Sequence, residues 1–494
     1  MPRGSRLEYT EVQTVIDAGA LEADWVSEEL SGVDLSDERL DRRLMKTAQH
    51  LARSPISPIN EACGDWPSTQ AAYRLFNNPK ASPRAILKPH RQATVERMVA
   101  ADGPVLCIQD TVFISYLQHS KTKGLGPVGK SNSAAERGLI MHNALAFTTA
   151  GVPLGVLSQS VWARDEVPKE EYQEKIERLQ ATAIEQKESF KWLVALRETV
   201  QHTPPGVKVV TVADRESDFF EFITEAAHLR AHFLIRARSN RHLVPEDSEG
   251  FASILEALGA APVLGDMTVD IPSNGKRKAR TASVSVRVAP VTLKPPQRRG
   301  QAKLSGSTEP LSVNVIAVTE EHPPAGIEAI SWVLLTDLAV KDVDSAAEKV
   351  EWYGQRWGIE TWHKVLKSGC KVEDCRLEEA ARLKRHLALF SIIAVRLMYV
   401  TYVARAQPDL PATEVFSAAE LEALYVRVKE TLPPPEPPSV REAVRMLGGL
   451  GGHLGRKCDK EPGITVLWRG FMRMYEDVAV LRAYKRTLSR GDSS

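Results

Sequence analysis

Cysteine is scarce in this chain, and its placement excludes several classes of protein. The five cysteines among 494 residues are odd in number, scattered, and include no C-x2-C pair. A disulfide-stapled secreted domain needs a dense set of cysteines, and the common zinc sites need closely spaced ones. We therefore expect reduced thiols in a cytosolic protein.

A secretory or membrane segment is also missing. The first residues, MPRGSRLE, contain no apolar run of the signal-peptide type. The most apolar stretch, 387–404, is interrupted by Arg396, which favours a buried helix over a membrane span. These features predict a cytoplasmic protein that has no membrane partner.

The chain has almost no net charge, since its formal charge at pH 7 is +1. Charge alone therefore does not indicate a nucleic-acid-binding protein. The total hides a local imbalance, because residues 276–303 contain nine lysines and arginines and no acidic residue. This stretch is either a flexible, solvated loop or a loop that faces phosphates, and its composition does not separate the two.

The N-terminal region has the pattern of short helices with polar connections. We expect one helix over 37–44, with Ser36 as its N-cap, and another over 68–76, ahead of Asn77-Asn78-Pro79. Residues 1–88 are therefore predicted to form a small helical domain.

Strand-like and helix-like segments alternate after residue 104. Apolar runs predict a strand, a turn and a second strand within 105–116, a hairpin over 138–158, and strands over 207–214 and 232–236. Helical periods fall at 170–202 and 218–229. This order predicts an α/β core.

The helical period is lost between residues 237 and 332. Short alternating segments at 267–271, 282–288, 311–318 and 330–335 predict a β-rich insertion at about 238–332. The core, expected over 89–405, resumes after it. A proline-rich link at 432–439 interrupts a helical C-terminal domain, expected over 406–494.

The most specific pattern lies between residues 353 and 367. Tyr353, Arg356, Glu360 and Lys367 follow the spacing Y-x2-R-x3-E-x6-K, which puts them on one face of a helix. One carboxylate among phosphate-seeking groups suits a metal-dependent enzyme that acts on a nucleic-acid backbone. A solvated face of mixed charge is the alternative, but three tryptophans, Trp352, Trp357 and Trp362, are unusual on such a face.

Two further acids end apolar strands. Asp110 follows 105–109 and Asp214 follows 207–213. Ligand sites in α/β sheets lie at the carboxyl ends of strands, so both acids can meet Glu360 there. Three carboxylates repel one another unless cations are bound, and hard oxygen ligands favour Mg2+ or Mn2+. An acid at a strand end also often caps the next turn, which is the alternative role for Asp214.

These elements resemble a known family. Gln109-Asp110-Thr111, Asp214-Arg215-Glu216 and the pattern from Tyr353 to Lys367 are similar to the Asp-Asp-Glu signature of bacterial cut-and-paste transposases of the insertion-sequence-four family. The likeness covers nearly the whole chain and includes segments 37–39, 72–79, 332–336, 391–397 and 464–468.

The resemblance implies a ribonuclease-H-like catalytic core in which Asp110, Asp214 and Glu360 bind two Mg2+ ions, with Mn2+ as a substitute. It also implies an N-terminal domain that reads the transposon's inverted-repeat ends and a C-terminal domain that forms a homodimer in a synaptic complex. Such enzymes nick one strand, form and open a hairpin, and join the 3′ ends to target DNA. They work at the bacterial nucleoid.

The same resemblance assigns residues to DNA. Tyr353, Arg356 and Lys367 are expected to hold phosphates, with Lys364 as a further backbone contact. Trp332 and Trp357 match base-stacking positions, although both are also plausible core aromatics. The remaining DNA contacts that it implies are Arg236, Arg376, Arg39 and Arg43.

Two alternatives remain open. A transposase-derived regulator would bind DNA without cutting it, and the presence of all three acids argues against decay of the site. A ribonuclease-H-like structure-specific nuclease would cut without strand transfer. Detection of hairpin ends would distinguish a transposase from both.

Overall fold

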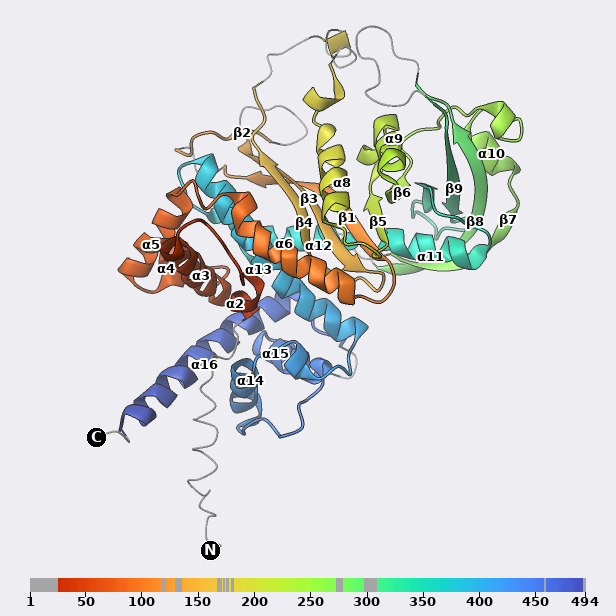
Figure 1. Ribbon diagram of the computed structural model, residues 1–494. Coiled ribbons are helices and arrows are strands. Elements are labelled where there is room, and N and C mark those ends of the chain that lie inside the picture. The colour runs from red at the N-terminus through yellow and green to blue at the C-terminus, as the bar shows by residue number, and fades with distance from the viewer. Residues whose placement is uncertain are drawn as a thin grey trace, which may run out of the picture. The chain divides into compact units, whose positions relative to one another are not determined.

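The computed structural model describes most of the chain, in two compact units. One unit comprises His90–Ser368 and Val372–Val395, and the other comprises Met1–Pro89, Gly369–Lys371 and Arg396–Ser494 (Figure 1). The described residues are 25–117, 121–128, 136–166, 171, 174, 177, 178, 182–271, 279–296, 309–456 and 459–491.

The first unit is built on a mixed β-sheet. Strands β1 (Val105–Ser115), β3 (Arg137–Thr148) and β4 (Pro153–Trp162) form an antiparallel meander, and β5 (Val209–Ala213) and β6 (His232–Arg236) run parallel to β1. The order β4-β3-β1-β5-β6 is that of a ribonuclease-H-like core, which confirms the predicted fold class. A two-residue strand, β2 (Gly126–Pro127), pairs with β3.

The predicted turn within 105–116 is wrong, because β1 is one continuous strand. Gln109, Asp110 and Thr111 pair in register with Ala144, Asn143 and His142 of β3. These polar residues therefore remain in the strand.

The β-rich insertion extends the same sheet. Strand β10 (Ser331–Thr336) pairs with β6, and β9 (Leu311–Thr319), β8 (Arg280–Leu293) and β7 (Val263–Ile271) follow in that order. The insertion also contains a helix that the sequence reading missed, α10 (Ile254–Ala260), which Ser253 caps at its N-terminus. At seven residues, α10 is too short to display a helical period.

Six of the nine cations in the basic stretch 276–303 lie outside the described residues. Among those described, Arg280 forms a bidentate ion pair with Glu320, at 2.5 and 2.7 Å, and Arg287 donates to the Ala261 carbonyl oxygen at 2.8 Å. These two cations are thus engaged within the protein.

Helices cover both faces of the sheet. Helices α8 (Phe190–His202), α9 (Phe220–Leu229) and α10 lie on one face, where Trp192, Leu196 and Phe222 are fully buried (Figure 1). Each such side chain stabilises the fold by roughly 1.5–3 kcal/mol. Helices α11 (Val343–Gly354) and α12 (Trp357–Lys364) cover the other face.

Helix α8 is shorter than the predicted helix over 170–202. A 3-10 turn at Ile184–Gln186 precedes it, and much of 167–181 lies outside the described residues. The predicted strands over 207–214 and 232–236 and the helix over 218–229 are confirmed.

The second unit is helical. Its elements are α2 (Trp25–Glu29), α3 (Glu38–Arg53), α4 (Ile59–Cys63), α5 (Trp66–Asn77), α14 (Ala418–Lys429), α15 (Val440–Leu450) and α16 (Ile464–Gly491). Asp37, and not Ser36, caps α3, because its carboxylate accepts from the backbone N–H groups of Arg39 and Leu40. Ser36 adopts a left-handed conformation with φ of 60° and so precedes the cap.

Two long helices, α6 (Pro83–Ala100) and α13 (Ala380–Ala406), each have residues in both units. Among the described residues, α13 alone is long and apolar enough to cross a membrane. Since 83% of its most apolar window is buried inside the protein, the prediction of a buried helix is confirmed.

Candidate active site

Asp110, within β1, and Asp214, directly after the parallel neighbour β5, lie at equivalent register positions. Where β1 and β5 pair with each other, the last pair is Ile108 and Val212. Each acid follows two residues later in its own chain segment. Residues two apart on a strand point to the same face, and paired strands lie about 4.8 Å apart. This register places both acids on one face of the sheet, where the charge of Asp214 acts on Asp110.

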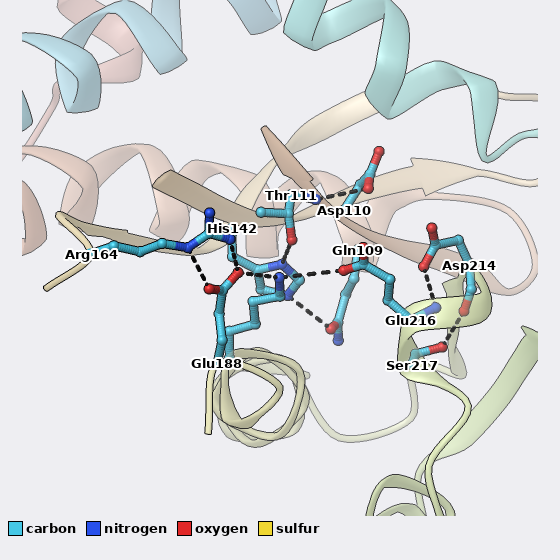
Figure 2. A network of polar contacts seen from close by, with 10 residues as sticks. Gln109, Asp110, Thr111, His142, Arg164, Glu188, Asp214, Glu216 and Ser217 are labelled. Atoms are coloured by element: carbon cyan, nitrogen blue, oxygen red, sulfur yellow. Dashed lines mark hydrogen bonds and ion pairs between the residues drawn. The ribbon is translucent and has the colours of Figure 1, made fainter. Parts of the chain in front are cut away.

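Alternation along β1 separates the site from a second polar cluster. Thr111 and Gln109 point to the face of α8, where their side-chain oxygens lie 2.9 and 3.4 Å from the ring nitrogens of His142 (Figure 2). Asp110 points the opposite way, toward α12 (Figure 2). The carboxylate is thus directed at the helix that carries Glu360.

The two carboxylate oxygens of Asp110 have different surroundings. Oδ1 accepts a hydrogen bond from the Thr111 backbone N–H at 2.8 Å. Oδ2 lies 3.8 Å from Arg356 Nη1 and 3.9 Å from His363 Nδ1, beyond hydrogen-bond reach of either. Burial, aided by the nearby charges of Asp214 and Glu360, raises the pKa of Asp110 to about 7, against the opposing effect of Arg356.

Asp214 also caps the turn that follows it. Its Oδ1 accepts from the Glu216 backbone N–H at 2.8 Å, and its carbonyl oxygen accepts from the Ser217 hydroxyl at 2.6 Å (Figure 2). The capping role considered as an alternative is therefore present. It fixes the carboxylate through one oxygen.

The signature segment is not the single helix that its period predicts. Tyr353 belongs to α11, Arg356 occupies the break that precedes α12, and Glu360 lies in the first turn of α12. Lys367 falls on a π-helical turn, η4 (Val365–Gly369). Gly354 ends α11, and the chain passes through a turn at 355–356 before helical geometry resumes.

Arg356 links the helix to the strand acid. Its Nη2 donates to Glu360 Oε1 at 2.5 Å, while Nη1 faces Asp110. Although burial opposes its charge, Tyr353, Glu360 and Asp110 together raise the pKa of Arg356. The guanidinium therefore stays charged between two of the acids.

An aromatic pair lies next to this cluster. The rings of Trp332 (β10) and Tyr353 meet edge to face, with centroids 5.7 Å apart. Arg236, which pairs with Leu334 across β6 and β10, donates to the Ser331 carbonyl oxygen at 3.0 Å. Burial lowers the pKa of Arg236 and raises that of Tyr353.

The other predicted DNA contacts are more dispersed. Lys367 Nζ donates to the Phe113 carbonyl oxygen at 3.0 Å and lies 2.9 Å from Glu373. The half-buried ring of Trp357 lies under the Arg356 guanidinium, 5.9 Å from centroid to Cζ. Lys364 and Arg376 are exposed, and Arg39 and Arg43 lie on α3 in the helical unit.

Sequence reasoning missed four polar residues around the site: Glu373, His363, Asn143 and Gln159. Asn143 Nδ2 lies 3.4 Å from His363 Nε2, and Gln159 Nε2 donates to Asn143 Oδ1 at 3.1 Å. Burial, with Lys367 and Arg356 nearby, lowers the pKa of His363 to about 3. One signal was available, since His363 lies three residues after Glu360 on the same helix face.

The three acids supply the hard oxygen ligands that Mg2+ prefers. Among the described residues, no three histidine, cysteine, aspartate or glutamate side chains are already arranged around one ion position. Glu360 is bonded to Arg356 and Asp214 to the Glu216 amide, so both carboxylates have protein partners. The chemistry of the donor set fits a divalent metal, with Arg356 beside it as a competing cation.

Comparison with known proteins gives three family matches. Residues 22–81 match the model described as Transposase DNA-binding, residues 186–396 match Transposase DDE domain, and residues 392–491 match Transposase Tn5 dimerisation domain. Among solved structures, the chain is similar to a piggyBac transposase synaptic complex with hairpin DNA, at 11% identity and a TM-score of 0.35. That alignment covers 75% of this chain and 67% of the other.

Proposed function

Because this chain belongs to the Tn5-like transposases of the insertion-sequence-four family, with DNA-binding, Asp-Asp-Glu and dimerisation segments, we propose that it excises a mobile element and inserts it elsewhere. In this proposal the enzyme nicks one strand at each transposon end, forms and opens a hairpin, and joins the 3′ ends to target DNA. The observation that carries the proposal is the register of Asp110 and Asp214 beside Glu360.

We assign the metal site to Asp110, Asp214 and Glu360. DDE transposase domains act with divalent metal ions, and we propose two Mg2+ ions, replaceable by Mn2+. Bound metal would neutralise the acids and polarise the scissile phosphate. The raised pKa of Asp110 supports this assignment, because burial, together with two nearby carboxylates, disfavours its charge until a cation is present.

The cations and aromatics around the acids are assigned to DNA. Arg356 has the planar fork that grips a phosphate, and Lys367 provides a point charge. The charges of Arg356 and Arg236 both act on the Tyr353 hydroxyl. This hydroxyl can donate a hydrogen bond to an oxygen of the DNA backbone. Trp332 is half-buried near the start of strand β10. It is assigned to stack on a base that leaves the duplex when the hairpin forms. Further contacts are assigned to Trp357, Lys364, Arg376 and Arg236.

The helical segments are assigned to assembly. We propose that residues 1–88 read the transposon ends through α3, where Arg39 is exposed and Arg43 is half-buried one turn later. Residues 406–494 would form the homodimer of the synaptic complex, in which two proteins hold two ends. A protein with these partners would act at the bacterial nucleoid.

The test needs the element's own ends, which are found as inverted repeats in the DNA that flanks the gene. With such a duplex and Mg2+, we expect Asp110→Asn, Asp214→Asn and Glu360→Gln each to lower the nicking rate by at least about 1,000-fold, because each removes a metal ligand. Binding of the end should stay within about threefold of wild type. Asp266→Asn, an exposed acid on β7, serves as the matched control.

Each outcome of this experiment is decisive. Normal nicking by any one of the three variants would remove that residue from the metal site. End binding without nicking by the wild-type protein would favour the non-cutting regulator. Nicked products without hairpin ends would favour a structure-specific nuclease.

A further inference from the structure

A line of polar side chains extends from α13 to α12, the helix that carries Glu360, and ends near Asp110. It comprises Ser391 on α13, Gln159 on β4, Asn143 on β3 and His363 on α12. Ser391 and Asn143 are fully buried, and His363 is 7% exposed. The proposed chemistry does not use these residues, yet their line ends 3.9 Å from the Asp110 carboxylate.

The hydrogen bonds along this line have a fixed direction, because the line begins at a backbone acceptor. The Leu387 carbonyl oxygen can only accept, so the Ser391 hydroxyl donates to it, at 2.8 Å. The Ser391 oxygen then accepts from Gln159 Nε2, at 2.7 Å. The orientation of the Gln159 amide follows from that bond.

The direction continues through Asn143. The same Gln159 amide nitrogen also donates to Asn143 Oδ1, at 3.1 Å. With its oxygen used in this way, Asn143 turns its Nδ2 toward His363 Nε2, at 3.4 Å. His363 Nε2 must therefore accept, which requires an unprotonated nitrogen at that position.

A neutral imidazole carries one proton, so an accepting Nε2 leaves the proton on Nδ1. Nδ1 is the nitrogen that faces Asp110 Oδ2. The other oxygen, Oδ1, is already held by the Thr111 N–H. In this tautomer Oδ2 meets an N–H bond dipole, whereas in the other it would meet a nitrogen lone pair and be repelled.

We propose that Ser391, Gln159 and Asn143 fix His363 in its Nδ1–H tautomer, and that His363 is thereby a positioning residue for Asp110. The inference rests on the proposed function only for the role of Asp110 as a metal ligand. The imidazole N–H orients Oδ2 from a distance beyond hydrogen-bond contact, which leaves that oxygen available to a metal ion. Outer contacts of this kind affect metal affinity strongly, since they orient the ligand.

The tautomer can be measured without any activity assay. In full-length protein labelled with 15N-histidine, the two ring-nitrogen shifts distinguish Nδ1–H from Nε2–H, and His363→Asn identifies which signals belong to residue 363. We expect the Nδ1–H pattern in the metal-free wild type. We expect Asn143→Leu, which keeps the branched shape and the number of heavy atoms and removes the donor, to shift the signals toward Nε2–H. An Nε2–H pattern in the wild type would overturn the proposal.

A matched pair of substitutions tests the effect on the site. In His363→Asn, the side-chain amide replaces Nδ1 and keeps a donor toward Asp110. In His363→Gln, the amide replaces Nε2, so that donor is lost. We expect the Mg2+ concentration for half-maximal nicking to rise by about 10-fold or more in His363→Gln and by less than about threefold in His363→Asn.

A role in packing alone predicts a different result. Asn is one methylene smaller than Gln, so packing loss alone would raise the Mg2+ requirement at least as much in His363→Asn as in His363→Gln, and that result would refute the positioning role. Thermal unfolding and end binding of each variant show whether it is folded. If Asp110→Asn still nicks DNA while the Nδ1–H tautomer is observed, the metal-ligand assignment fails and the hydrogen-bond direction stands.

Discussion

The ammonium group of Lys367 lies 2.9 Å from the carboxylate of Glu373. Glu373 Oε1 also accepts from the Ser115 backbone N–H at 2.8 Å, so the same acid ties the end of β1 to the lysine. A DNA phosphate that binds Lys367 must therefore compete with a resident carboxylate.

Glu373→Gln should strengthen binding of the transposon end. The amide oxygen can still accept from Ser115, but the competing charge is gone. A partly exposed ion pair is worth about 0.2–1 kcal/mol, so we expect the Kd to fall by about 1.5–5-fold. Gel-shift titration at two salt concentrations measures the change. A weaker or unchanged affinity would mean that Glu373 does not compete with DNA for Lys367.

Trp332→Ala should slow hairpin formation more than the first nick. The indole is half-buried beside Tyr353, and stacking on a displaced base is worth about 1–3 kcal/mol. We expect hairpin formation to slow by about tenfold and nicking by less than about threefold. Trp332→Phe is the control, since it keeps an aromatic face. Equal slowing of the two steps would exclude a base held by this ring.

The metal-free protein should lose stability as the pH rises from about 4 to about 7. Asp110 has a raised pKa of about 7, so within this window the folded state keeps a proton that the unfolded chain has released. The free energy of unfolding should then fall by at most about 1.4 kcal/mol per pH unit from this group. Urea unfolding in EDTA measures this slope, and Asp110→Asn should reduce it. Identical slopes for the two proteins would mean that Asp110 is ionised throughout.

An exposed apolar row on α16 is expected to form the dimer contact. Val480, Tyr484 and Leu488 are 67%, 60% and 49% exposed and recur every four residues, which places them on one side of the helix. Val480→Lys with Leu488→Lys should abolish pairing of two ends while single-end binding persists. Light scattering with DNA present measures the pairing, and Leu432→Lys, at an exposed loop position, is the control. Unimpaired pairing would place the interface elsewhere.

The strands next to Asp110 and Asp214 could be located from sequence because each acid follows an apolar run, and such runs form central strands. The sequence also placed Arg356 and Glu360 on one helix face, and the structure shows the two side chains in contact, since residues four apart on a helix meet. Their neighbours were harder to read. Gln109, Asp110 and Thr111 look like a turn by composition, yet they remain in β1 because both faces of the strand there are occupied by polar partners.

Long-range partners could not be predicted in the same way. Glu373 and Asn143 meet the site through tertiary contacts, and no local period reports them. The break at 355–356 was also hidden, because Gln355 and Arg356 keep right-handed helical dihedral angles and the period runs on through them. Gly354 was the one local signal of a helix end. Helix α10 was missed because seven residues give less than two full turns of periodic signal.

The π-helical turn at Val365–Gly369 sets the direction in which the Lys367 side chain projects from the helix axis. A π-turn holds one residue more than an α-turn, and each α-helical residue rotates the chain by about 100°. Removing a single residue here would tighten the turn and swing Lys367 to a different side, with every side chain unchanged in chemistry. The angle about the helix axis between Glu360 and Lys367 therefore depends on the number of residues in the turn. A one-residue deletion at this turn should thus be more damaging than most substitutions.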